Sequence, residues 1–222
     1  MKEILLSMIT AAVYAVFLRN LLFSGGLGTT EVIRAAQRNS EIALTALLVS
    51  LFSAAAGVVS RLVAVALFTE RVIGRIPHWR FSVHNLPYAW LTLLFALILL
   101  ALYLLVCGVI ALLPIKSKRL LHKRMGMSVL NTLVMAVPLL SFRMGYMSRG
   151  MPHAIGIPHV VGMGLGAGLA FLIVTMLVNS GMHILQQNKA IPSMFTGVPA
   201  TLIYTGLLAL AFTGFTGEIL FQ

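Results

Sequence analysis

Six long apolar segments separated by short polar loops constrain this chain more than any other feature of its sequence. A helix needs about 20 apolar residues to cross the hydrocarbon core of a bilayer. Backbone inside that core must satisfy its own hydrogen bonds, so such segments form helices. All six qualify or nearly qualify, and we expect spanning helices at residues 4–23, 42–68, 88–113, 127–142, 160–185 and 198–220.

Composition supports an integral membrane protein. Hydrophobic residues make up 59% of the chain and charged residues only 9%, whereas soluble domains carry about 25% charged residues. The net charge of +11 comes from loops between apolar segments, which is the pattern of loops that face anionic lipid. No aromatic and basic module accompanies this charge, so we expect the lipid bilayer and not nucleic acid as its partner.

The distribution of basic residues predicts an orientation. Eight Lys and Arg follow the first, third and fifth segments, against five on the opposite side. Basic loops stay in the cytoplasm. We therefore expect a multi-pass protein of the bacterial inner membrane, with both termini outside.

The chain divides into two similar halves within a single domain, residues 1–222. The halves, about 1–114 and 115–222, each begin with a short or interrupted segment and continue with cleaner ones. Three helices per half give the halves opposite topology. The expected fold is thus an all-α integral membrane protein, with six transmembrane helices in two inverted three-helix repeats and interrupted helices 1 and 4.

The interruptions are the best sequence indication of a site near the middle of the membrane. The candidates are Arg19, Asn20, Gly25, Gly26, Gly28, Thr30, Asn131 and Thr132. Arg19 either faces the interior or extends to the headgroups. The glycines either let the backbone approach a cofactor or a partner closely, or only permit a tight turn.

Other motifs point to packing more than to chemistry. Gly162, Gly164, Gly166 and Gly168 form small-xxx-small pairs that favour close helix contact. The single cysteine, Cys107, forms no internal disulfide and no paired-cysteine metal site. The histidine spacing indicates no metal site, the acids are too few for a carboxylate relay, and no catalytic residues are expected.

The run "IPSMFTGVPATLIYTGLLALAFTGFTG", residues 191–217, is the most specific text in the chain. It resembles the last span of the Rnf/Nqr membrane subunits of the RnfA and NqrE type, with their P-x-x-F-x-G loop and A-F-x-G-F-x-G ending. "GLGAGLAF", residues 164–171, and "RNLLFSGGLG", residues 19–28, are also similar to that family. The resemblance covers the whole chain and is weakest between about residues 68 and 118.

The resemblance implies a subunit of an ion-motive electron-transfer complex that pairs with a second membrane subunit of opposite topology, or with its own copy. Each family member gives two cysteines, one per half, to an iron–sulfur centre between the subunits. In this chain Thr30 and Thr132 stand at the matching positions, with Asn131 kept. A threonine hydroxyl does not replace a thiolate. We therefore expect no iron–sulfur centre and no other cofactor.

Two functions remain open. The first is a Rnf/Nqr-type membrane subunit without its own redox centre, which serves ion or solute passage or only structure. The alternative is the substrate-binding membrane component of a vitamin-type transporter, because such subunits are also small, basic and about six-spanned.

The orientation can be tested with single-cysteine variants. We expect Ser117→Cys, in a cytoplasmic loop, to resist an impermeant thiol reagent added to intact cells, and Ser148→Cys to react. A Cys107→Ser background removes the native thiol. Labelling of Ser117→Cys from outside would reverse the orientation.

Overall fold

The computed structural model describes residues 2–18, 22, 28–37, 42–68, 88–112, 125–126, 128–149, 156–188, 192 and 197–220, without the side chains at several helix ends. The described elements are all helical. They are α1 Lys2–Val13, the π-helical turn η1 Tyr14–Leu18, α3 Thr29–Ala36, α4 Ile42–Phe68, α6 Tyr88–Leu112, α8 Thr132–Arg149, α9 Ile157–Gln187 and α10 Val198–Leu220. The expected all-α class is therefore confirmed for this part of the chain.

Two of the expected segments differ from the helices that form. The regular α-helix of the first segment ends at Val13 and widens into η1, which is described as far as Leu18. The fourth segment was expected from residue 127, but α8 begins at Thr132 and continues to Arg149. The start moves because Asn131 caps the helix. The end moves because hydropathy marks only the apolar part of a helix, and α8 continues through a less apolar stretch to Arg149.

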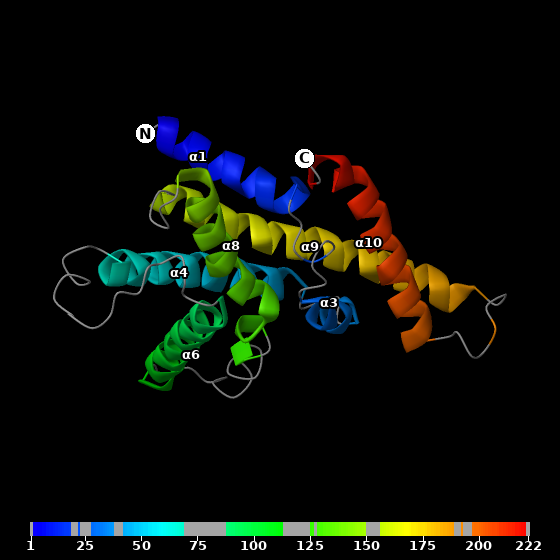
Figure 1. The fold of residues 1–222 in the computed structure, drawn as a ribbon. Helices are drawn as coiled ribbons and strands as arrows, with labels where there is room; N and C mark the ends of the chain where they lie inside the picture. Colours follow the sequence, from blue (N-terminus) through cyan, green and yellow to red (C-terminus); the bar gives the residue numbers. More distant parts are fainter. Residues whose placement is uncertain are drawn as a thin grey trace.

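The long helix α9 organises the molecule (Figure 1). Helices α1 and α4 lie along it, α1 parallel and α4 antiparallel, and α8 and α10 cross it. Helix α6 packs against α4 and α8 at the margin. With 31 residues, α9 is about 46 Å long at 1.5 Å per residue, longer than a hydrocarbon core of about 30 Å. It is therefore long enough to cross the hydrocarbon core.

Glycines on α9 let α1 and α4 approach it on two faces. A Cβ built on Gly166 would lie 2.6 Å from the backbone oxygen of Ala12 in α1. A Cβ on Gly168 would lie 2.9 Å from the backbone oxygen of Ala46 in α4 and would overlap Ser50. Gly162 and Gly164 make equally close contacts, with Met8 and Ala54. The glycines predicted to pack against neighbouring helices therefore contact the backbones of two helices.

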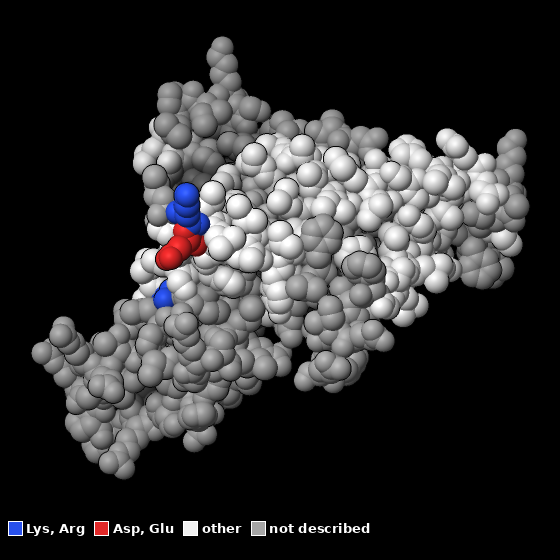
Figure 2. All heavy atoms as spheres, turned by 90° about the horizontal axis from the view of Figure 1, so that it is seen from above, with Lys and Arg blue, Asp and Glu red and all other residues white. Residues whose placement is uncertain are grey.

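Three described helices are long and apolar enough to cross a membrane: Ile42–Val63, Thr92–Leu112 and Ile157–Gln187. Thr132–Phe142 and Val198–Phe212 are shorter apolar helices. Figure 2 shows a face whose described charges gather at one end, with uncharged residues over the rest of its described surface. These features fit a membrane protein, while the six-span arrangement with inverted repeats stays a prediction.

The contact between α9 and α4 can be tested by adding one methyl group. We expect Gly168→Ala to lower stability by on the order of 1–3 kcal/mol, because the backbone and Ser50 leave no room for a Cβ. Gly108→Ala in α6 is the matched control, since no atom lies within 4 Å of its added Cβ. Thermal unfolding in detergent measures both variants, and equal midpoints would contradict the close contact.

Candidate functional site

Helix α3 begins at a glycine in a left-handed backbone conformation. Gly28 has φ of +80° and is the N-cap of α3, without a side-chain capping bond. Its carbonyl accepts the first hydrogen bond of the helix, from the Val32 amide at 3.0 Å. Because L side chains rarely adopt this φ, glycine suits the position by its conformation alone.

Helix α8 begins beside it, at an asparagine cap. The Asn131 Oδ1 atom accepts a hydrogen bond from the Leu133 amide at 3.0 Å. The Asn131 carbonyl accepts one from the Met135 amide at 3.2 Å. This is the usual geometry of an Asn N-cap, and it explains why the helix begins here within an apolar stretch.

The two helix starts meet. The Gly28 amide donates a hydrogen bond to Thr132 Oγ1 at 2.9 Å, although the two residues are 104 positions apart in the chain. A Cβ on Gly28 would lie 3.0 Å from Asn131 Oδ1 and 3.2 Å from both Leu133 Cβ and Leu22 Cδ2. We call Gly28, Asn131 and Thr132 the junction. It joins the N-termini of α3 and α8.

The residues predicted as a midplane site are only partly brought together. The junction contains Gly28, Asn131 and Thr132. Thr30 lies on the exposed side of the first turn of α3. Arg19, Asn20, Gly25 and Gly26 lie outside the described residues. Helices α3 and α8 begin at Thr29 and Thr132, and the proximity of Thr30 to Thr132 stays a prediction.

The junction is buried on one side and open on the other. Asn131 is 4% exposed and Leu22 1% exposed. Thr132 and Leu130 are exposed, Leu130 by 52%. On the first turn of α3, the Glu31 carboxylate pairs with the Arg34 guanidinium at 3.4 Å. Such an exposed pair contributes little stability.

The junction does not fit the iron–sulfur centre that the family resemblance implies. Its described side chains end in a hydroxyl and an amide, whereas such clusters are held by thiolates. Cys107 lies in α6 and belongs to no part of the junction. Among the described residues, no group of three or more His, Cys, Asp or Glu side chains is placed to hold a metal ion.

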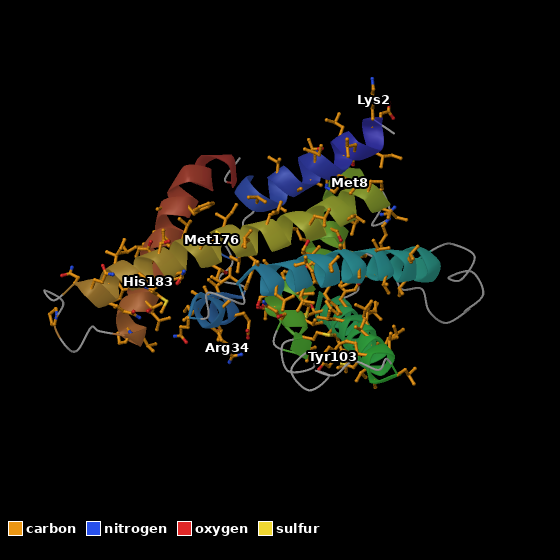
Figure 3. All side chains as sticks on the ribbon, turned by 180° about the vertical axis from the view of Figure 1, so that it is seen from behind. Lys2, Met8, Arg34, Tyr103, Met176 and His183 are labelled. Atoms are coloured by element: carbon orange, nitrogen blue, oxygen red, sulfur yellow. The ribbon has the colours of Figure 1, made fainter. Side chains whose placement is uncertain are left out.

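A second site lies between the end of α3 and the end of α9. A groove of about 280 Å³ is lined by Ala36 and Gln37 of α3 and by Asn179, Met182, His183 and Gln186 of α9. Figure 3 labels His183 on α9. The sequence marks His183 only as one of six histidines. Asn179, His183 and Gln186 recur at helical spacing on one face. This pattern could have indicated the groove from the sequence.

A third, smaller cavity lies between α4 and α8, lined in part by Ser60, Arg61, Pro138 and Ser141. Ser60 Oγ is buried without a hydrogen-bond partner in the described part of the chain. Pro138 has no amide hydrogen to give to the carbonyl four residues earlier. The polar lining and the small volume of this cavity suit a single bound water molecule.

Comparison with known proteins found similarity to one subunit of a membrane complex. No protein-family model matches the chain. Two curated Rhodobacter capsulatus sequences, each described as the A subunit of an ion-translocating oxidoreductase complex, are similar to it at 30% identity over 103 residues. The match covers 45% of this chain and 48% of each relative. The chain thus spans about half the length of the curated relatives it matches.

Gly28 and Gly197 offer a matched test of the junction. Both have positive φ, +80° and +78°, and both precede a helix, but no atom lies within 4 Å of a Cβ on Gly197. We expect Gly197→Ala to cost about 1 kcal/mol from backbone conformation alone. Gly28→Ala should cost more, because its Cβ also meets Asn131 and Leu133.

Thermal unfolding of the purified variants in detergent compares the two substitutions. Equal losses would mean that only backbone strain acts at Gly28 and that the two helix starts do not pack closely.

Proposed function

We propose that the chain is a membrane subunit related to the ion-translocating Rnf/Nqr electron-transport complexes, without a redox centre of its own. It serves ion or solute passage or acts as a structural partner subunit. The similarity to the A subunit of such a complex in R. capsulatus carries the proposal. The apolar helices support a multi-pass membrane location.

The junction supports the same relationship independently. Interrupted helices at corresponding places in two halves are typical of transport-related membrane folds with inverted repeats. Here α3 begins after Gly28, downstream of the first expected segment, and α8 begins within the fourth one; the Gly28–Thr132 hydrogen bond links the two helix starts. This link is what six spans in two inverted three-helix repeats, interrupted at helices 1 and 4, would produce.

The proposed lack of a redox centre rests on the chemistry of the junction. A protonated hydroxyl is a hard, weak ligand for iron, and a primary amide is no better. Thr132 also uses its oxygen to accept a hydrogen bond from Gly28. Electrons in such a complex therefore pass through other subunits.

A second membrane subunit of opposite topology, or a second copy of this chain, is the proposed partner. The open side of the junction, with Thr132, Thr30 and Leu130 exposed, is the surface that it would cover. Polar groups exposed at membrane depth are costly next to lipid and are satisfied next to protein. We place the complex in the bacterial inner membrane, with the termini of this chain outside.

The groove between α3 and α9 favours a second candidate, the substrate-binding component of a vitamin-type transporter. Its polar side chains both donate and accept hydrogen bonds. Its volume of about 280 Å³ is near the lower limit of about 300 Å³ for small-molecule pockets. This candidate has no related sequence behind it.

Purification of the tagged chain from its native host in mild detergent separates the two candidates. We expect it to copurify with a second multi-pass subunit and with flavin- or iron-bearing subunits. The chain purified alone should be colourless and free of iron and sulfide, even when prepared anaerobically. A stoichiometric organic ligand on an unpartnered chain would favour the transporter, and stoichiometric iron would overturn the absence of a redox centre.

A further inference from the structure

The side chains of Thr132 and Asn131 each accept a hydrogen bond within the chain and each have a donor left over. Thr132 Oγ1 accepts a hydrogen bond from the Gly28 amide, so its own hydrogen points elsewhere. Asn131 Oδ1 accepts one from the Leu133 amide. The other end of that amide group, Nδ2, is buried and has no partner in the described part of the chain.

An orphaned buried donor is costly. Leaving a buried polar group unsatisfied costs about 1–3 kcal/mol, and buried side-chain groups normally have partners. Asn131 is 4% exposed, and its Oδ1 lies 3.0 Å from the position of a Cβ on Gly28. Because Nδ2 sits on the same amide carbon, this donor lies where the two helix starts meet.

The backbone adds to this excess of donors. The first amides of a helix have no intrahelical acceptor, and each N-terminus carries a partial positive charge. At the junction two such ends converge, from α3 with eight residues and α8 with eighteen. Each end favours negative charge next to it, and in a water-poor region this preference is stronger than at a protein surface.

One acidic side chain in the described part of the chain would repel an anion at the junction. Glu31 lies in the first turn of α3, but the Arg34 guanidinium pairs with it at 3.4 Å. The Glu31 side chain is 21% exposed and that of Arg34 is 51% exposed. The charges of the pair are therefore largely compensated, and the pair leaves the field of the two helix ends in place.

We propose that the junction binds one small monovalent inorganic anion, of the size of chloride. Thr132 Oγ1–H and Asn131 Nδ2–H are its side-chain donors, and the converging helix ends supply the electrostatic attraction. The burial of Nδ2 excludes a larger ligand or a segment of a partner protein from that donor. The exposed side of Thr132 gives an ion its access. This proposal needs only this chain and does not depend on its partner in a complex.

The test is a chloride titration of the purified chain in detergent, with gluconate replacing chloride at constant ionic strength. A ligand that binds only the folded state raises the unfolding midpoint with concentration. We expect a rise on the order of 5 °C at a hundredfold excess over the dissociation constant. Bromide should act in the same way.

Two variants locate the effect. Asn131→Asp replaces the orphaned donor by a carboxylate oxygen of the same shape and should abolish the chloride response. Asn179→Asp makes the same change on α9, away from the junction, and should keep it. If Asn131→Asp does not fold, Thr132→Val serves instead and should weaken the apparent chloride affinity at least fivefold. Its control is Thr175→Val, at a buried threonine whose hydroxyl has no partner in the described residues.

A wild-type midpoint that does not respond to chloride would overturn the proposal and point to a water molecule at Asn131. A response kept in both junction variants would also overturn it, because the ion would then bind elsewhere. Neither result affects the outcome of the copurification experiment, so this proposal and the proposed function can fail separately.

Discussion

The hydrogen bond between the Gly28 amide and Thr132 Oγ1 is the contact on which the proposed membrane fold depends. A helix that breaks inside a bilayer frees amides and carbonyls that lipid cannot satisfy. In the proposed fold the chain breaks twice, and the Gly28–Thr132 hydrogen bond joins the helix starts that follow the breaks. The side chain of Asn131 caps α8 from within, and that of Thr132 accepts the amide hydrogen of Gly28, just before α3, from the other half of the chain.

The close contacts of α9 fix the helices next to the junction in the chain. Helix α1 precedes Gly28, α4 follows α3, and both lie against glycines of α9. Between apolar helices in lipid, association rests on close van der Waals packing more than on the hydrophobic effect. A methyl group at Gly166 or Gly168 would push α1 or α4 outward, and the distance between Gly28 and Thr132 would change with it. The packing motif and the candidate site are therefore mechanically linked.

Much of the fold could be predicted because lipid imposes one simple rule. The expected segments 42–68 and 198–220 have the bounds of α4 and α10, since apolar length alone decides where such helices lie. The start of α8 could not be predicted in this way. Hydropathy treats Met127 to Phe142 as one segment, while the break depends on a single Asn side chain that bonds two residues ahead.

The candidate site, like the fold, could be predicted only in part. The glycines and the interruptions marked Gly28, Asn131 and Thr132, because unusual residues in apolar segments are visible in a sequence. The hydrogen bond between the Gly28 amide and Thr132 Oγ1 could not be predicted, because it depends on how two helix starts 104 residues apart in the chain pack together. The groove was missed because its residues come from α3 and α9, which are distant in sequence, and none of them is unusual at the end of a membrane helix.

The electrostatic field of the junction does not depend on which ligand it holds. Converging helix N-termini favour negative charge, and a cluster bound by thiolates carries negative charge as well. Under the proposed function, threonines in place of cysteines would remove the iron ligands and leave the helix ends, the Asn131 cap and the Gly28 turn where they are. Such a scaffold would still favour negative charge without redox chemistry. Thr132 and Asn131 each already accept a hydrogen bond within the chain, and their donors act in the same direction as the helix ends. The exchange would therefore change the chemistry available to the site without reversing the sign of charge that it favours.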